Sequence, residues 1–191
     1  MASINIVGLD PSLNNLGIVE AQIDIDTFEV KVARLMLAQP PKADNATKKA
    51  VRKNSDDLRR ARFLQSALTE VCRGASLAIA EVPVGSQDAR AMASYGICIG
   101  VLSSCPVPMI EVTPTEVKLS AVGKKTASKA EMIAWAMDKH PDANWKMRKR
   151  KGELVPTNDN EHLADAIAAI YAGIQTEQFK QAVSMMRAMA A

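Results

Sequence analysis

Four side chains in this sequence have the types and positions to bind divalent cations. Asp10 ends the apolar run of residues 4–9, and Glu81 ends a second run, SLAIAE; such runs form buried strands. The segment EHLADAIAAIYAG contributes His162 and Asp165 at positions i and i+3, which lie on one face of a helix. If the two strands are parallel neighbours, both carboxylates face one crevice, where a shared metal ion would join them to the helix. Alone, Asp10 would be an ordinary turn residue that accepts backbone N–H bonds.

The residue types favour Mg²⁺ or Mn²⁺, because these ions prefer oxygen ligands and keep several waters, which suits phosphate chemistry. Two such ions ~3.5 to 4 Å apart can activate a water and stabilise the leaving oxygen of a phosphodiester. The helical face that carries Asp165 continues through Ala166, Ala169 and Ile170, so the carboxylate needs a charged partner. The pattern therefore predicts metal-dependent hydrolysis.

The elements that must position these groups follow from hydrophobic periodicity. Strands are predicted at 4–9, 16–23 and 28–37, the last two joined as a hairpin around DIDT, and a polar, basic loop follows at 39–54. The remaining predictions are helices at 55–72, 87–104, 114–121, 128–139, 161–174 and from 177 onward, and strands at 76–81 and 107–112. Three early strands followed by alternating helices and strands predict a mixed α/β sheet with helices on both faces.

Length and composition bound the class of protein. The 191 residues suit one well-packed domain, and 48% hydrophobic with 24% charged residues is the balance of a globular protein. No apolar stretch approaches the ~20 residues of a membrane span, and the N-terminus lacks a signal-peptide pattern, so a cytoplasmic location is expected. Cys72, Cys98 and Cys105 have no paired spacing and are predicted to be buried small apolar residues rather than disulfides or metal ligands.

The net charge of +3 is unevenly distributed. Residues 39–62 hold eight Lys or Arg against three Asp or Glu, and residues 116–151 hold ten against four, so the remainder is acidic. Each run could be a solvated helix face, but KMRKRK at 146–151 places five like charges in six residues, which favours a polyanion partner. The candidate DNA-binding residues in these runs are Lys48, Lys49, Arg52, Lys53, Lys124, Lys125, Lys149, Arg150 and Lys151.

Five segments, in order and spacing, carry a resemblance to a known family. They are GLDPSLNNLGIV, AIAEVPVG, YGICIGVL, VTPTEVKLSAVGKKTASKAEM and EHLADAIAAI. Together they resemble the RuvC family of Holliday-junction resolvases, from about Ile4 to about Ile174. The resemblance implies a ribonuclease H-like fold, with three early antiparallel strands and then parallel strands. The helix predicted from 177 onward would form a C-terminal extension at about 176–190, beyond the part of the chain that carries the resemblance. It also implies a homodimer that cleaves four-way junctions during DNA recombination and repair.

The resemblance also implies roles for particular residues. Asp10, Glu81, His162 and Asp165 match the family's four metal positions, which hold two Mg²⁺ or Mn²⁺ ions. A further two residues, Lys118 in TEVK and Lys129 in ASKAE, match the family's basic positions, which would contact the phosphate backbone or stabilise the transition state.

Two departures from the family pattern bear on the substrate. The loop VPVGSQDAR after Glu81 lacks an aromatic residue, whose stacking is worth ~1 to 3 kcal/mol per base, so stringent sequence selection is not expected. The basic loop at 42–53 is long and strongly charged, which predicts broader binding to branched DNA. Such a relaxed nuclease would suit a virus or mobile element, in which case it would act in the host cytoplasm.

Two other classes of protein fit parts of the pattern. Sugar kinases, actin and heat-shock ATPases share a strand-and-turn opening around an aspartate, but they need a second copy of the fold, and no second strand-turn-strand motif is present. The other alternative is a DNA-binding scaffold that has kept the fold and lost the chemistry. Carboxylates at all the expected element ends count against this second class.

Overall fold

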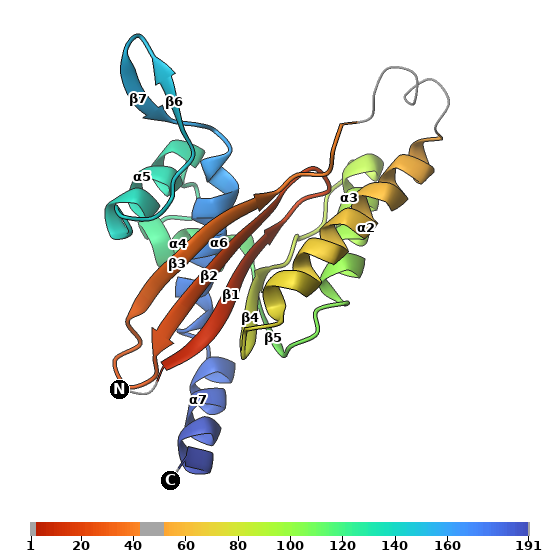
Figure 1. The fold of residues 1–191 in the computed structure, drawn as a ribbon. Coiled ribbons are helices and arrows are strands. Elements are labelled where there is room, and N and C mark those ends of the chain that lie inside the picture. The colour runs from red at the N-terminus through yellow and green to blue at the C-terminus, as the bar shows by residue number, and fades with distance from the viewer. Residues whose placement is uncertain (1–2, 43–51, 191) are drawn as a thin grey trace.

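The sheet has the mixed topology that the sequence predicts (Figure 1). The computed structural model describes residues 3–42 and 52–190. Its strand order is β3-β2-β1-β4-β5, in which β1 to β3 form an antiparallel meander and β4 and β5 run parallel to β1. The strands are β1 Ser3–Pro11, β2 Leu16–Asp24, β3 Val30–Ala38, β4 Leu77–Glu81 and β5 Met109–Val112. The α/β, ribonuclease H-like fold class is therefore confirmed.

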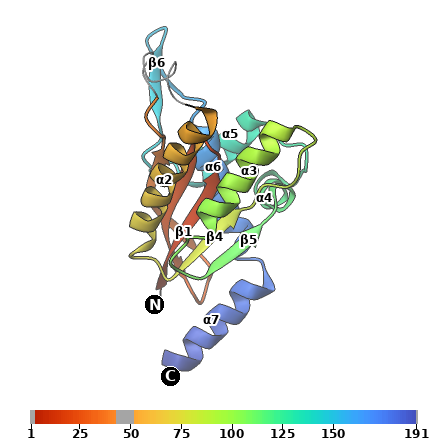
Figure 2. The same cartoon turned by 90° about the vertical axis from the view of Figure 1, so that its right-hand side faces the viewer.

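Helices cover both faces of this sheet (Figures 1 and 2). The pair α2 Lys53–Cys72 and α3 Ala89–Leu102 packs on one face, over a core that includes Leu9 and Ala80. On the opposite face lie α4 Pro114–Val122, α5 Lys129–Lys139 and α6 Asn160–Gly173, and α7 Glu177–Ala190 follows at the far end of the sheet. No helix in the described part of the chain is both long and apolar enough to span a membrane.

Helix α6 is the central element of its layer, because its apolar residues are almost wholly buried against the sheet. Two glycines let its backbone approach the strands closely. A Cβ atom at Gly8 would collide with the carbonyl oxygen of Ala166, and one at Gly17 with the carbonyl oxygen of His162. The glycines of β1 and β2 therefore set how near the helix that carries His162 can come to the sheet.

Helix α2 begins two residues earlier than predicted. Its N-cap is Arg52, which makes no side-chain cap hydrogen bond, so the Ser-Asp-Asp sequence that suggested the start lies inside the helix. The second aspartate, Asp57, is buried and accepts two hydrogen bonds from Arg90 of α3, at 2.6 and 2.7 Å. The ion pair of Asp57 with Arg90 therefore joins α2 to α3, and Asp57 does not cap a helix.

A second, two-stranded sheet was not predicted. Strands β6 Met147–Arg150 and β7 Glu153–Pro156 pair as an antiparallel hairpin that projects from the body (Figure 1). The two residues of its turn, Lys151 and Gly152, have φ of 52° and 89°, as a type I′ hairpin turn requires. The basic run at 146–151, which sequence reasoning left without secondary structure, thus forms the first strand and the turn of this hairpin.

The structure describes the three cysteines but not most of the predicted basic loop. Cys72 and Cys98 are free and buried, as predicted, whereas the free Cys105 is only partly buried; the sulfur atoms of Cys72 and Cys105 lie 3.7 Å apart. Most of the loop at 39–54, with Lys48 and Lys49, lies outside the described residues, as does the side chain of Lys53.

Candidate metal centre

Strand register places Asp10 and Glu81 side by side. Leu9 pairs with Ala80 in the parallel β1–β4 ladder, so the next residue of each strand is a carboxylate at the same edge. Leu9 and Ala80 face the α2–α3 layer, and because side chains alternate along a strand, Asp10 and Glu81 face α6. Asp10 is 9% exposed and Glu81 is half-buried. Two carboxylates thus meet at the ends of two core strands.

Helix α6 brings His162 against this edge. The Nδ1 atom of His162 lies 2.6 Å from Oδ2 of Asp10, and its Nε2 atom lies 3.1 Å from Nδ2 of Asn15. The Oδ1 atom of Asn15 accepts a hydrogen bond from Gln39, which orients the Asn15 amide so that its NH₂ group faces the imidazole. In the neutral ring, Nε2 is therefore the acceptor and Nδ1–H donates to Asp10. Sequence reasoning missed Asn15, which lies only two residues before the paired Gly17.

Burial and mutual repulsion make the two remaining carboxylates weak acids. Burial first, and then the negative charges of Asp10 and Asp165, raise the pKa of Glu81 to about 8. Burial first, and then Asp10, raise the pKa of Asp165 to about 7. Neither carboxylate forms an ion pair with a described residue, and the nearby positive charges of Lys118 and, for Asp165, His162 offset these upward pKa shifts only in part.

The imidazole of His162 responds to the same negative charge. Burial acts to lower the pKa of His162, but the hydrogen bond and the charge of Asp10 outweigh it, with help from Glu161 and Asp165, and the net shift is upward. A site that raises the pKa values of both its acids and its base is one in which negative charge dominates. A cation is the species that would relieve it.

The predicted basic residues Lys118 and Lys129 both lie near the carboxylates. Lys118, on α4, lowers the pKa values of Glu81 and Asp165 through its positive charge. Lys129, at the start of α5, forms an ion pair of 2.7 Å with Glu161, and that glutamate lies 3.7 Å from Nε2 of His162. Glu161 is a fourth carboxylate at the edge of the site, and sequence reasoning did not select it although it adjoins His162.

The donor chemistry of this site fits a hard divalent cation, but the side chains do not yet converge on one point. No group of three or more His, Cys, Asp or Glu side chains within residues 3–42 and 52–190 stands close enough together to hold a metal ion. The ion pair between Asp10 and His162 engages one of the oxygen atoms that a cation would need. Three carboxylates with one imidazole are a suitable ligand set for Mn²⁺ or Mg²⁺.

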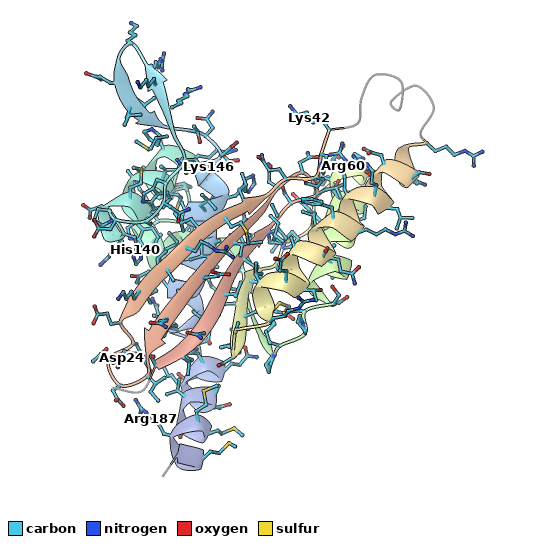
Figure 3. The ribbon with its side chains drawn as sticks, in the orientation of Figure 1. Asp24, Lys42, Arg60, His140, Lys146 and Arg187 are labelled. Carbon is cyan, nitrogen blue, oxygen red and sulfur yellow. The ribbon has the colours of Figure 1, made fainter. Side chains whose placement is uncertain are left out.

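The other predicted DNA-binding residues lie around the site rather than in it. Arg52 is the exposed residue before α2, and Lys124 and Lys125 follow α4, where Lys124 pairs with Glu131. Lys149 and Arg150 belong to β6 and are exposed. Figure 3 shows Lys146 at the base of the hairpin, with Lys42 and Arg60 on the other side of the strand ends. Positive side chains thus lie on two sides of a negative centre.

Comparisons with known proteins agree with the fold. The sequence matches no protein-family model and shows no significant similarity to a curated protein. The structure, however, superimposes on that of RuvC from Thermus thermophilus in complex with a Holliday junction substrate, with a TM-score of 0.60. The two chains are 16% identical, over 88% of this chain and 92% of RuvC. A second structure of Thermus thermophilus RuvC matches with a TM-score of 0.58, at the same identity and coverage. The chain thus has a RuvC-like fold of the ribonuclease H-like class.

Proposed function

We propose that this chain is an endonuclease that cleaves phosphodiester bonds in four-way (Holliday) junctions and other branched DNA by two-metal-ion hydrolysis. The observation that carries the proposal is the gathering of Asp10, Glu81, His162 and Asp165 where β1, β4 and α6 meet. They lie on a fold shared with a protein whose structure holds a Holliday junction.

The proposed roles follow from position and charge. Asp10 would hold the ions together with Glu81 beside it, and α6 would supply His162 and Asp165 as further ligands. Bound Mg²⁺ or Mn²⁺ would supply an activated water and stabilise the leaving oxygen. Lys118 is placed to attract the substrate phosphate while lowering the pKa values of the two buried carboxylates.

The proposal includes a homodimer, because a junction contains two strands to cut. Helix α3 has an exposed apolar face suited to such an interface: Met92 is 45% exposed, Ile99 is 46% exposed, and Gly96 and Gly100 have open space where a Cβ would stand. Ile99→Lys should therefore convert the dimer to a monomer in sedimentation experiments, with an unchanged circular dichroism spectrum. Leu58→Lys, on the exposed side of α2, is the matched control. A chain that is monomeric before any substitution contradicts this part of the proposal.

Strand cleavage of labelled DNA tests the function directly. We expect Mg²⁺- or Mn²⁺-dependent cutting of a four-way junction, with weaker cutting of flaps and forks and little of linear duplex. Binding of the junction without cleavage in either metal would instead identify a DNA-binding scaffold. Equal cutting of the linear duplex would identify a nuclease without structural selectivity.

A further inference from the structure

The β6–β7 hairpin is a strongly basic ribbon that stands apart from both hydrophobic cores. Four consecutive residues, Arg148 to Lys151, are basic and exposed, and the only acidic residue in the hairpin is Glu153. Leu154, on the second strand, is 63% exposed. A two-stranded hairpin with so little buried surface has marginal stability in water by itself, so binding to a partner would stabilise it further.

Its base is nevertheless fixed to the helix of the candidate metal centre. Asn160, the first residue of α6, is fully buried and binds the backbone of Lys146 twice: its Oδ1 accepts from the Lys146 N–H at 3.0 Å, and its Nδ2 donates to the Lys146 carbonyl at 2.9 Å. The N–H of Thr157 donates to the same carbonyl, at 2.9 Å. Asn160, two residues before His162, therefore fixes the direction in which the hairpin leaves the body of the protein.

The turn of the hairpin places a cation at its tip at a conformational cost. Lys151 has a φ of 52°, in the left-handed region, where Asn, Asp or Gly is easier to accommodate. A lysine there extends the positive charge of β6 to the outermost point of the ribbon. Strand pairing sets Arg148 and Arg150 on one face and Lys149 with Leu154 on the other, so both faces are basic.

We propose that the β6–β7 hairpin inserts into the major groove of a B-form DNA arm and so anchors that arm beside the candidate metal centre. The proposal rests on the proposed function for the identity of the substrate. The major groove is about 12 Å wide and about 8.5 Å deep and admits a two-stranded ribbon, whereas the minor groove is about 6 Å wide. Four residues per strand reach roughly 14 Å, which exceeds the depth of the groove.

A groove leads from the base of the hairpin to Glu161, at the edge of the candidate metal centre. This groove, of about 610 Å³, runs between α5 and the segment after β7, and its lining includes Pro156 at the base of the hairpin and the ion pair of Lys129 with Glu161. The hairpin projects beyond the end of the sheet at which β1 and β4 end (Figures 1 and 2). A duplex held by the hairpin would thus lie along this surface toward Asp10.

The test combines a shortened protein with DNA whose grooves are blocked separately. Because the Thr157 N–H already donates to the Lys146 carbonyl, residues 147–156 can be replaced by a two-residue Asn-Gly turn with the base of the hairpin retained. Junction arms carry either glucosylated 5-hydroxymethylcytosine, which fills the major groove, or netropsin in A·T tracts, which fills the minor groove. Affinity is measured in Ca²⁺ or EDTA.

Major-groove glucosylation should weaken binding of the intact chain roughly tenfold or more, and netropsin should not. The shortened variant should bind more weakly and be insensitive to glucosylation, because the group that meets the glucose is gone. Equal sensitivity of the two proteins, or sensitivity to netropsin in place of glucose, overturns the proposal. So does equal affinity for DNA and RNA duplex arms, since the major groove of A-form RNA is too narrow for the ribbon.

A second variant guards against misfolding of the shortened protein. Arg148→Gln with Arg150→Gln alters one face of the ribbon and leaves the turn intact, and it should reduce the glucose effect at least in part. Lys31→Gln with Lys180→Gln, in β3 and α7 and outside the hairpin, is the matched control and should keep the full effect. If the groove effects appear but Mg²⁺ or Mn²⁺ gives no cleavage, the proposed nuclease activity fails while the hairpin proposal stands.

Discussion

The metal centre and the β6–β7 hairpin differ in how their charges are supported. At the metal centre, carboxylates of the two central strands and of α6 are buried in a negative environment that raises their pKa values. In the hairpin, positive side chains are exposed on a thin ribbon that makes its firmest contacts at Lys146. Under the proposed function, the core holds the groups that chemistry requires in fixed positions, and the periphery holds the charges that would contact DNA.

Removing a charge should therefore have different effects in these two regions. Removing a charge from the centre should stabilise the metal-free fold while it destroys chemistry, because repulsion there opposes folding. Removing a charge from the hairpin should leave stability and the chemical step almost unchanged while it weakens binding.

Glu81→Gln should have the largest effect of the substitutions that separate the two regions. It keeps the shape of the side chain and removes a charge that the ions need, so cleavage of a saturated junction should fall to below about one thousandth of the wild-type rate. The melting temperature in EDTA at about pH 8 should rise, because the variant no longer buries a charge there and no longer repels Asp10. Unchanged cleavage together with an unchanged melting temperature would show that Glu81 lies outside the centre.

His162→Ala should lower cleavage by about 100-fold, and His162→Asp should restore much of it with an all-oxygen site. Because an imidazole binds a metal only when it is neutral, the aspartate variant should remain active at lower pH than the wild type. His140→Ala is the control: His140 contacts the Tyr171 hydroxyl at 3.2 Å and no site carboxylate. Equal losses of cleavage at the two histidines would remove His162 from the centre.

Neutralising Lys149, Arg150 and Lys151 together with Gln should weaken junction binding and leave the cleavage rate at saturation nearly unchanged. Fewer counterions are released, so the slope of log K against log salt should become smaller by roughly 3, at ~0.9 for each phosphate that the variant no longer neutralises. The control variant Lys31→Gln with Lys180→Gln should keep the slope. A preserved slope in the hairpin variant would mean that the ribbon is solvated and does not contact phosphates.

The dependence of stability on pH should have a defined sign. The folded-state pKa values of Glu81, about 8, and Asp165, about 7, exceed the ordinary values of 4.5 and 3.8, so the folded chain binds more protons than the unfolded chain in that range. The contribution of these two carboxylates to the free energy of unfolding should therefore fall as pH rises from about 4 to about 8. The raised pKa of His162 acts in the same direction, since its contribution is present at low pH and lost on deprotonation.

Thermal melts at about pH 5.5 and about pH 8, with and without Mn²⁺, measure this effect. Mn²⁺ should stabilise the chain more at the higher pH, where it does not compete with protons. Asp165→Asn should flatten the pH profile, and Asp138→Asn, at an exposed position of α5, should not. A metal-free chain that is more stable at the higher pH would contradict the electrostatics of the centre.

Much of the fold was predictable because its core strands and helices have clear hydrophobic patterns. The run before Asp10 is apolar except for Asn5, and residues 77–80 before Glu81 are all apolar, as in strands covered on both faces. The helix from Asn160 has the matching apolar stripe. The register that sets Asp10 beside Glu81 follows from the parallel pairing of those strands. The topology alone was therefore enough to predict that the four candidate ligands lie at one edge of the sheet.

The hairpin and the support of His162 were not predictable in this way. The sequence MRKR has no apolar alternation, and its strand pairing is supported by the distant Asn160, whose contact with Lys146 no local pattern indicates. Likewise, Asn15 reaches His162 only because Gly17 lets α6 approach β2. Both features depend on contacts between elements, which periodicity within one element does not encode.

A pair of assays on one preparation of Asp10→Asn tests the central claim most directly. Gel-shift affinity for a four-way junction is measured in Ca²⁺ or EDTA, and strand cleavage is measured in Mg²⁺ or Mn²⁺. Asp10 is the carboxylate that contacts His162 and raises the pKa values of Glu81 and Asp165, so its removal should abolish cleavage. Junction binding should persist or tighten, because less negative charge faces the phosphates. Near-normal cleavage by the folded variant would contradict the metal centre and return Asp10 to the role of a turn residue.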